Sequence, residues 1–373
     1  MLWHFEDYCM GFRCGIIGLP NVGKSTIFNA LTAAGAEVAN YPFCTIEPNV
    51  GIVPVPDVRL ERIAAAINPP KVTHTTMEFV DIAGLVKGAS KGEGLGNKFL
   101  GHIRDVDAVV HVIRCFDDTN VAHMHGRIDP AYDMDVVNTE LLLADLDTVE
   151  RRMAKIERLV KTGDKSLLRE LELCSVIREA LGRGMVSRNV SVDEEGAKIV
   201  QEMHLLTWKK VLYVANVSEV VLRDGGPYIN AVSDVARREG AGVVIICGDV
   251  EEGIAQMTME EKKEFLEDLG LKESGLEQLI HEGYRLLGLI TFYTTAGSEL
   301  RAWTVGHGTK AVHAAGKIHT DMEKGFIRAE VLHYNDFILQ GSIAEARERG
   351  IVRFEGREYM VQDGDIVYFR FKV

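Results

Sequence analysis

Hydrophobic and polar positions alternate along the chain with two different spacings, and together they predict the fold class. Apolar runs of strand length are followed in turn by segments in which apolar residues recur every three or four positions. Strands that alternate with helices in this way are typical of a parallel sheet covered by helices on both faces. The expected strands of this doubly wound sheet are residues 14–17, 77–80, 108–114, 213–215 and 243–247.

Residues 139–181 interrupt this alternation with helical spacing only. The pattern breaks at residues 161–166, which predicts an antiparallel hairpin of two helices inserted into the sheet domain. Near the predicted tip, residues 151–169 hold seven basic and two acidic residues, a local excess of +5. This excess is compatible with an RNA-facing tip and equally with a solvated helix face. The basic residues are Arg151, Arg152, Lys155, Arg158, Lys161, Lys165 and Arg169.

From Gly288 onwards the pattern becomes rich in strands, which predicts a separate C-terminal domain. Residues 289–373 hold 11 basic and 11 acidic residues, so the acidity of the chain resides elsewhere. The whole chain of 373 residues is long enough for two or three domains.

The segment "GLPNVGKS", residues 18–25, lies between the first expected strand and a helix. It matches the pattern GxxxxGK[ST], in which glycines let backbone N–H groups converge on phosphate oxygens at the start of the helix. Lys24 is expected to reach the β- and γ-phosphates, and the hydroxyl of Ser25 to bind Mg²⁺. The predicted nucleotide contacts in this loop are Asn21, Val22, Gly23, Lys24, Ser25 and Thr26.

A second phosphate-site signal follows the strand at residues 77–80. Asp81 and Gly84 have the Asp-x-x-Gly spacing, in which the aspartate holds Mg²⁺ through water and the glycine N–H contacts the γ-phosphate. Between the two motifs, Thr45 is a candidate metal ligand that closes over the γ-phosphate, with an ordinary strand threonine as the alternative. The predicted metal ligands are therefore Ser25, Thr45 and Asp81.

Three segments, "GLPNVGKST", "YPFCTIEPNVG" and "DIAGLVKGASKGEGLGN", together resemble the YchF branch of the Obg-like ATPase family. The resemblance runs from about Met10 to Val373. It implies a P-loop domain (residues 10–117 and 207–287), an inserted helical hairpin domain (118–206) and a C-terminal β-grasp TGS domain, ubiquitin-like in fold (288–373). It also implies an ATPase that contacts ribosomes or ribosomal RNA.

The base-reading motif of GTP-binding proteins, Asn-Lys-x-Asp, is altered at residues 216–219. Asn216 remains, but Val217 replaces the lysine and Glu219 replaces the aspartate. The extra methylene of Glu219 moves its carboxylate beyond the two donors of guanine, so guanine selectivity should collapse. We expect Asn216 to contact the base and Cys247 and Gly248 to close over it, with ATP preferred to GTP. The alternatives are an ordinary strand exit and a GTPase with relaxed base recognition.

The residue that orients the attacking water is not evident, because Leu85 stands where many GTPases carry a glutamine. Asn21 is one candidate for catalysis, because related potassium-activated GTPases hold K⁺ with an asparagine here. The resemblance implies His123 as a second candidate, with a loop histidine without a catalytic role as the alternative. Slow turnover, or a binding module in which turnover is incidental, also fits Leu85.

Composition and charge limit the remaining possibilities. The net charge of −13 argues against a broadly basic surface, and nothing in the sequence indicates DNA specificity. The N-terminal ten residues lack a secretory pattern, and no apolar run is long enough to cross a membrane. Six scattered cysteines without a Cys-x-x-Cys pair favour reduced thiols, and we expect a cytoplasmic monomer.

Overall fold

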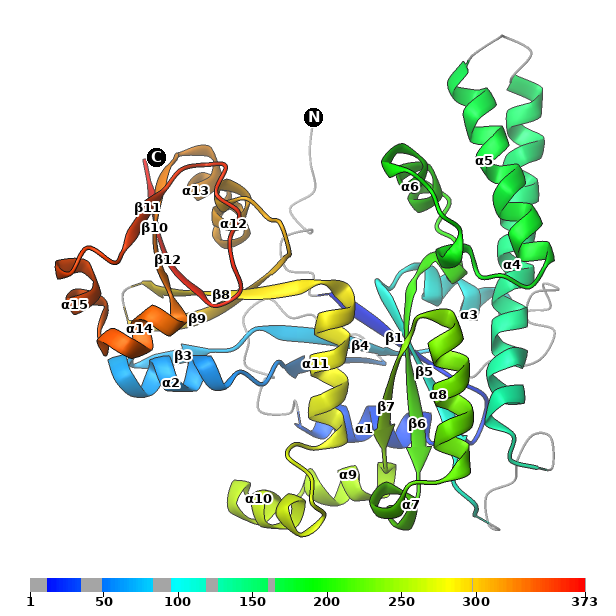
Figure 1. Cartoon of the computed structure of the whole chain (residues 1–373), viewed down its shortest axis with the longest axis horizontal. Helices are drawn as coiled ribbons and strands as arrows, with labels where there is room; N and C mark the ends of the chain where they lie inside the picture. The colour runs from blue at the N-terminus through cyan, green and yellow to red at the C-terminus, as the bar shows by residue number, and fades with distance from the viewer. Residues whose placement is uncertain are drawn as a thin grey trace.

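Two six-stranded sheets organise the molecule (Figure 1). The computed structural model describes residues 12–34, 49–82, 95–118, 127–159, 165–296 and 298–372. The first sheet has the order β2-β4-β1-β5-β6-β7, and all neighbours in it are parallel except β2 and β4. Its strands are β1 (Arg13–Ile17), β2 (Val50–Pro54), β4 (Thr76–Asp81), β5 (Ala108–Cys115), β6 (Lys210–Val217) and β7 (Gly242–Ile246).

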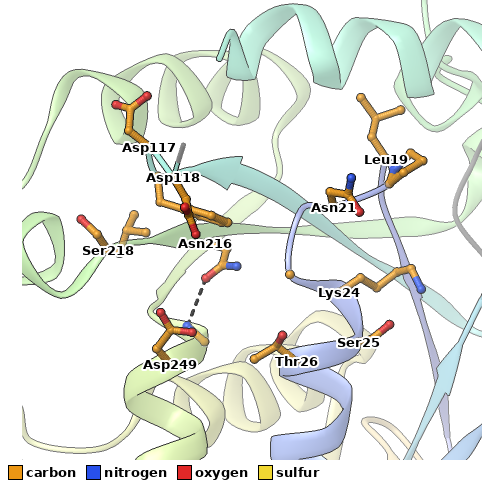
Figure 2. A pocket seen from close by; sticks show the side chains of 15 residues that line it. Leu19, Asn21, Lys24, Ser25, Thr26, Asp117, Asp118, Asn216, Ser218 and Asp249 are labelled. Carbon is orange, nitrogen blue, oxygen red and sulfur yellow. Dashed lines mark hydrogen bonds between the residues drawn. The ribbon is translucent and has the colours of Figure 1, made fainter. Parts of the chain in front are cut away.

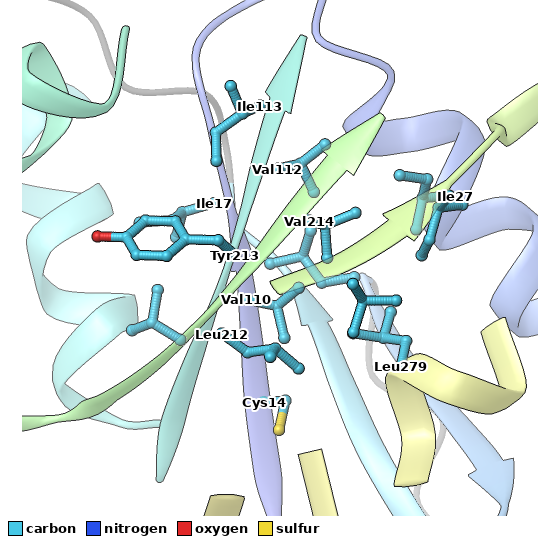
Figure 3. Close-up of a cluster of buried hydrophobic side chains, with 14 of the residues drawn as sticks. Cys14, Ile17, Ile27, Val110, Val112, Ile113, Leu212, Tyr213, Val214 and Leu279 are labelled. Carbon is cyan, nitrogen blue, oxygen red and sulfur yellow. The ribbon is translucent and has the colours of Figure 1, made fainter. Parts of the chain in front are cut away.

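Helices cover both faces of this sheet, as the alternation of hydrophobic patterns predicts. On one face Val214 lies near Ile27 of α1 and Leu279 of α11, whereas Tyr213 points to the opposite face (Figure 3). There the Tyr213 hydroxyl donates to Glu239 of α8 at 2.6 Å, and α4 packs beside α8. The helices of this domain are α1 (Lys24–Ala34), α3 (Leu95–Arg104), α7 (Glu219–Asp224), α8 (Pro227–Glu239), α9 (Gly248–Ile254), α10 (Met259–Asp268) and α11 (Gly275–Leu287).

The predicted helical hairpin consists of α4 (Pro130–Leu159) and α5 (Lys165–Gly182), which stand beside each other at one side of the molecule (Figure 1). The first half of α4 packs in the main core through Met134 and Val137, and only its second half packs against α5 through Val149 and Met153. The boundary at residue 118 stays a prediction, and the α4 residues from 130 to about 144, which follow it, pack in the core of the first sheet. No helix in the described residues is long and apolar enough to span a membrane.

The chain returns from the hairpin to the first sheet through one short α-helix and two 3-10 turns. These are η4 (Ser187–Asn189), α6 (Glu194–Glu202) and η5 (Leu206–Trp208). The buried carboxylate of Asp145 on α4 accepts hydrogen bonds from the backbone N–H groups of Leu206 and Thr207 at 2.7 and 2.8 Å, and from the Thr207 hydroxyl at 2.7 Å. Asp145 therefore fixes α4 to η5, the turn that precedes β6.

The second sheet has the order β11-β10-β12-β8-β9-β3. The first and last strands of the C-terminal segment, β8 and β12, lie parallel in its centre, and α12 lies between β9 and β10 in sequence, as in the predicted β-grasp arrangement. The elements after α11 are β8 (Leu289–Ala296), β9 (Glu299–Gly306), α12 (Ala311–Ile318), α13 (Thr320–Lys324), β10 (Phe326–His333), α14 (Tyr334–Gln340), α15 (Ile343–Glu348), β11 (Arg353–Glu355) and β12 (Asp365–Phe371).

The second sheet is completed by residues from the N-terminal half of the chain. Strand β3 (Lys71–Thr73) pairs with β9, and helix α2 (Val58–Ile67) buries Leu60 and Ile63 against the same sheet. The domain limits of 10–117 and 288–373 stay a prediction, while residues 58–73 contribute α2 and β3 to the C-terminal sheet. A three-residue strand carries too little pattern to reveal its distant partner.

Candidate functional site

The loop between β1 and α1 passes close to the ends of the neighbouring strands. Asn21 and Gly23 have φ values of 62° and 88°, in the left-handed region that glycine adopts without strain. A Cβ atom on Gly23 would lie 2.1 Å from Nδ2 of Asn216, so only glycine fits at this position. The loop is thereby held against β6 with the N-terminus of α1 directed at the adjoining pocket.

That pocket has a volume of about 830 Å³ and lies at the carboxyl ends of the parallel strands (Figure 2). Ligands of doubly wound sheets bind at this edge, where the strand order reverses. The lining comes from the β1–α1 loop and from the segments after β5, β6 and β7. It consists of Leu19, Pro20, Asn21, Gly23, Lys24, Ser25, Thr26, Phe116, Asp117, Asp118, Asn216, Val217, Ser218, Gly248 and Asp249.

Asn216 joins three parts of the pocket. Its Nδ2 donates to the carbonyl oxygen of Val22 at 2.9 Å. Its Oδ1 accepts from the backbone N–H of Gly248 at 3.1 Å (Figure 2). The residue is only 4% exposed, so these bonds fix the phosphate loop relative to the start of α9. Asn216 therefore has a structural role in addition to the predicted base contact.

The phosphate end of the pocket combines positive and negative groups. The ammonium group of Lys24 donates a hydrogen bond to the carboxylate of Asp81, and both side chains are largely buried. The hydroxyl groups of Ser25 and Thr26 line the pocket beside Lys24. Hydroxyl and carboxylate oxygens are the donors that Mg²⁺ prefers, so Ser25 and Asp81 fit a magnesium ion that keeps water ligands and binds phosphate oxygens. No cluster of three or more His, Cys, Asp or Glu side chains that could hold a metal ion occurs among the described residues.

Most predicted nucleotide contacts meet at this pocket, with some differences. Val22 contributes its carbonyl group to Asn216 and does not line the cavity. Cys247 is buried behind the pocket at the start of α9, and burial raises the pKa of its thiol. Glu219 begins α7 and pairs with Arg223 at 2.8 Å, so its exposed side chain is directed along that helix and not into the cavity.

Four residues to which the sequence assigns a role in nucleotide binding or hydrolysis lie outside the described residues. They are the predicted metal ligand, the glycine of the Asp-x-x-Gly motif, the leucine in the water-orienting position and the candidate catalytic histidine. These residues are Thr45, Gly84, Leu85 and His123.

Sequence reasoning missed the segment after β5, where Phe116, Asp117 and Asp118 enter the pocket. The available signal was that β5 is a buried parallel strand, whose carboxyl end must face the same edge as the phosphate loop. Arg114, only 2% exposed, supports this segment from below. Its guanidinium group donates to the carbonyl oxygens of Phe116 at 3.2 Å and Asp118 at 3.1 Å, and lies 4.7 Å from the centre of the Phe116 ring.

The basic residues of the hairpin are less available than the sequence suggested. Arg151 pairs with Asp147 at 2.7 Å, and Arg152 pairs with Glu170 at 2.5 Å. Arg169 contacts the carboxylates of both Asp193 and Glu195, which follow much later in the sequence. A count within residues 151–169 omits these partners, so the local excess of +5 overstates the positive charge of the hairpin.

A glycine-rich loop between a parallel strand and a helix, facing a large pocket at the carboxyl edge of the sheet, defines a P-loop nucleotide-binding protein. Comparison with known proteins agrees with this class. Residues 13–149 match a family described as a 50S ribosome-binding GTPase, and residues 289–372 match the YchF GTPase C-terminal family, described as a protein of unknown function.

Two curated relatives carry the name ribosome-binding ATPase YchF. The protein of Bacillus subtilis (strain 168) is 53% identical over 366 residues, and that of Escherichia coli O157:H7 is 50% identical over 364 residues. In both cases the match covers 98% of this chain and 100% of the relative. The solved structure of the Schizosaccharomyces pombe YchF GTPase superposes with a TM-score of 0.89 and 34% identity, over 96% of this chain and 98% of that chain. The chain belongs to the YchF family.

Proposed function

We propose that this protein is a ribosome-binding ATPase that prefers ATP to GTP and hydrolyses it slowly in the presence of Mg²⁺. Both curated relatives, which this chain matches over their whole length, are named ribosome-binding ATPases. This likeness supports the activity and the ribosomal partner. A ribosomal partner implies a cytoplasmic location. The monomeric state expected from the sequence remains part of the proposal.

The observation that carries the base preference is the position of residue 219. A guanine-reading aspartate must point its carboxylate into the base pocket, where it accepts from two donors on one edge of the base. Glu219 lies at the start of α7, is about half exposed and pairs with Arg223. Val217 lines the pocket but has no long stem to cover the ring. The other contacts, from Asn216, Gly248 and Phe116, do not require guanine.

The residues at the phosphate end of the pocket have different roles in nucleotide binding and hydrolysis. Lys24, at the N-terminus of α1, would neutralise phosphate charge together with backbone N–H groups of the loop. Ser25 and Asp81 would hold Mg²⁺, with Thr45 as the third predicted ligand, and the ion would neutralise charge that develops on the phosphates. Asn21 would hold K⁺ beside them, and His123 is the proposed mobile catalytic group.

Titration calorimetry with ATP and with GTP tests the base preference. We expect tighter binding of ATP by the natural protein, and a shift of at least about tenfold toward GTP in Glu219→Asp combined with Val217→Lys. Arg223→Gln is the matched control, since it releases Glu219 from its ion pair without changing its length. Tighter GTP binding by the natural protein would contradict the proposal and favour the GTPase alternative, in line with the name YchF GTPase that the S. pombe relative carries.

Co-sedimentation with ribosomes tests the partner and the coupling to nucleotide. A ligand moves a switch only if the two states differ in affinity for the partner. We expect different affinities with ADP and with a non-hydrolysable ATP analogue, and faster turnover with ribosomes and K⁺. If turnover stays negligible under every condition, the protein is a nucleotide-dependent binding module and Leu85 explains its inactivity.

A further inference from the structure

Strand β5 carries an arginine where a buried strand would ordinarily carry an apolar side chain. All eight residues of β5 are buried, and strands that are covered on both faces of a parallel sheet are mostly continuous apolar runs. Arg114, near the carboxyl end of this strand, is 2% exposed. Replacing buried ionic groups by apolar side chains of similar volume often leaves a protein equally stable or more stable. The stability of the core alone therefore does not explain an arginine at this position.

The guanidinium group of Arg114 acts on the segment that follows the strand. Its Nε donates to the carbonyl oxygen of Phe116 at 3.2 Å. Its Nη2 donates to the carbonyl oxygen of Asp118 at 3.1 Å, and the group lies 4.7 Å from the centre of the Phe116 ring. The donors of a guanidinium group form a rigid planar fork, which binds two acceptors and stacks on an aromatic ring at the same time. Arg114 therefore fixes both the backbone of residues 116–118 and the orientation of the Phe116 ring.

This segment forms the end of the pocket opposite the phosphate site. The strand register places Arg114 directly beside Asn216, the residue that we expect to contact the base. Asp118 lies near Asn216, whereas Lys24 lies on the other side of the cavity (Figure 2). Phosphates bind at Lys24 and the N-terminus of α1, so a bound base must lie toward Asn216, Phe116 and Asp118.

A purine bound at this end needs a surface for its flat faces as well as partners for its edge. Phe116 is the only aromatic side chain among the described residues that line the pocket. Bases stack on aromatic rings, and the loss of one such ring weakens binding by roughly tenfold. The guanidinium group of Arg114 covers part of the Phe116 ring, and the ring also lines the cavity. A base that stacks on this ring therefore has the arginine behind the ring.

We propose that Arg114 is a positioning residue for ATP, which holds the Phe116 ring and the backbone of residues 116–118 in the shape that receives the base. Arg114 does not itself line the cavity, so it acts through Phe116 and not by touching the nucleotide. The inference rests on the proposed function, because a purine must occupy this end of the pocket. It goes further by assigning part of the base affinity to a residue outside the pocket.

A double-mutant cycle tests whether Arg114 acts through the ring. The affinity of the full-length protein for ATP is measured by titration calorimetry in Arg114→Met, in Phe116→Ala and in the combined variant. Each single variant should weaken ATP binding about tenfold. Independent losses would multiply to about a hundredfold, whereas residues that act together are not additive. We expect the combined variant to bind ATP only about two- to threefold more weakly than Phe116→Ala.

Steady-state hydrolysis distinguishes a positioning role from damage to the phosphate end. In Arg114→Met the KM for ATP should rise about tenfold while kcat stays within about twofold, because Lys24 and Ser25 lie at the other end of the pocket. Arg114→Lys keeps the charge, but an ammonium group is a point donor and has no plane to stack on the ring. This variant should therefore recover only part of the lost affinity.

Arg188→Met is the matched control. Arg188 is also a largely buried arginine, which donates to the carbonyl oxygen of Thr207 at 3.4 Å and pairs with Glu239, and none of these three residues lines the nucleotide pocket. This variant should lower stability and leave both the affinity and the KM for ATP unchanged. Thermal unfolding of each variant verifies folding. If Arg114→Met does not fold, the cycle is run with Arg114→Lys, which retains hydrogen-bond donors.

The outcomes separate this inference from the proposed function. Multiplying losses in the cycle, full recovery in Arg114→Lys, or an equal loss of ATP affinity in Arg188→Met would overturn the inference. A lower kcat with an unchanged KM in Arg114→Met would also overturn it, since the effect would then lie at the phosphate end. If the natural protein binds GTP more tightly than ATP, the proposed base preference fails. The same cycle measured with GTP still decides whether Arg114 positions the ring.

Discussion

At the scale of single residues, Asn216 shows how one side chain serves both the fold and the site. Its amide uses one donor for Val22 and one acceptor for Gly248, which leaves one donor and one acceptor position for a base. Adenine and guanine each present a donor and an acceptor on the Watson–Crick edge, so this remainder fits either purine. Gly23 lies so close to Asn216 that any side chain at residue 23 would collide with the asparagine amide, so the loop and the asparagine position each other.

A second buried polar residue, His111, makes stability depend on pH. His111 lies in β5, is 2% exposed, and burial lowers its pKa to about 3. Histidine in the unfolded chain has a pKa of about 6.5, so between these values the unfolded chain binds one more proton. The free energy of unfolding should therefore fall by about 1.4 kcal/mol for each pH unit below about 6.5, through this residue.

Urea unfolding at several pH values between about 4.5 and 7 measures this dependence. His111→Phe should remove one proton from the slope, because phenylalanine keeps a ring in the core without titrating. Val110→Ala in the same strand is the control, since it should lower stability equally at each pH. An unchanged slope in His111→Phe would mean that the buried imidazole is protonated inside the fold.

At the scale of elements, the hairpin depends on a buried acid more than on its surface ion pairs. Asp145→Ala removes three hydrogen bonds to Leu206 and Thr207 and leaves buried donors without a partner. We expect a loss of about 2–4 kcal/mol in the free energy of unfolding, measured by chemical denaturation. Asp147→Ala, which breaks only an exposed pair with Arg151, should cost about 0.5 kcal/mol or less. Equal losses in the two variants would contradict this account.

Elements with strong local signals could be predicted from the sequence. The phosphate loop has a fixed spacing between β1 and α1, and the apolar stripes of α4 and α5 continue over many turns. Elements that are defined by distant partners could not be predicted from the sequence. The apolar residues Leu60 and Ile63 indicate a helix, but nothing local shows that α2 packs on the C-terminal sheet. The fold class was therefore accessible from the sequence, and the packing of α2 on the C-terminal sheet was not.

In the candidate site, too, the residues that belong to sequence motifs could be predicted, and those placed only by the fold could not. Lys24, Ser25 and Asn216 follow from motifs, and the structure brings them to one pocket. Glu219 was expected at the base because it follows a strand, but an acidic residue in the first turn is favourable for a helix and α7 begins there. Phe116 belongs to no short motif, and its position depends on how β5 is placed between β1 and β6.

At the scale of the whole molecule, Asp57 joins the N-terminal half of the chain to the C-terminal sheet. It accepts from the backbone N–H of Arg59 at 3.0 Å at the start of α2, and from the Tyr293 hydroxyl of β8 at 2.5 Å. Arg59 in turn pairs with Asp363 at 2.7 Å. Burial and then the carboxylates of Asp57 and Asp363 raise the pKa of Tyr293 above its ordinary range, whereas the charge of Arg59 lowers it.

Asp57→Ala should therefore loosen residues from both halves of the chain together. We expect a loss of about 2–4 kcal/mol from the missing helix cap and the unpaired hydroxyl of Tyr293. Hydrogen exchange should increase both in residues 58–73 and in residues 289–306. Arg62→Ala, an exposed change on the same helix, is the control. Faster exchange confined to one of the two segments would contradict the coupling.

The pairing of β3 with β9 also constrains how the chain is made. Lys71 lies opposite Glu299, so 228 further residues must be synthesised before its partner exists. At translation rates of about 5–20 residues per second, this interval lasts roughly 11–46 s. During that time Leu60 and Ile63 have no C-terminal sheet to cover them. The nascent chain must therefore keep the apolar face of α2 from making non-native contacts until translation reaches β9.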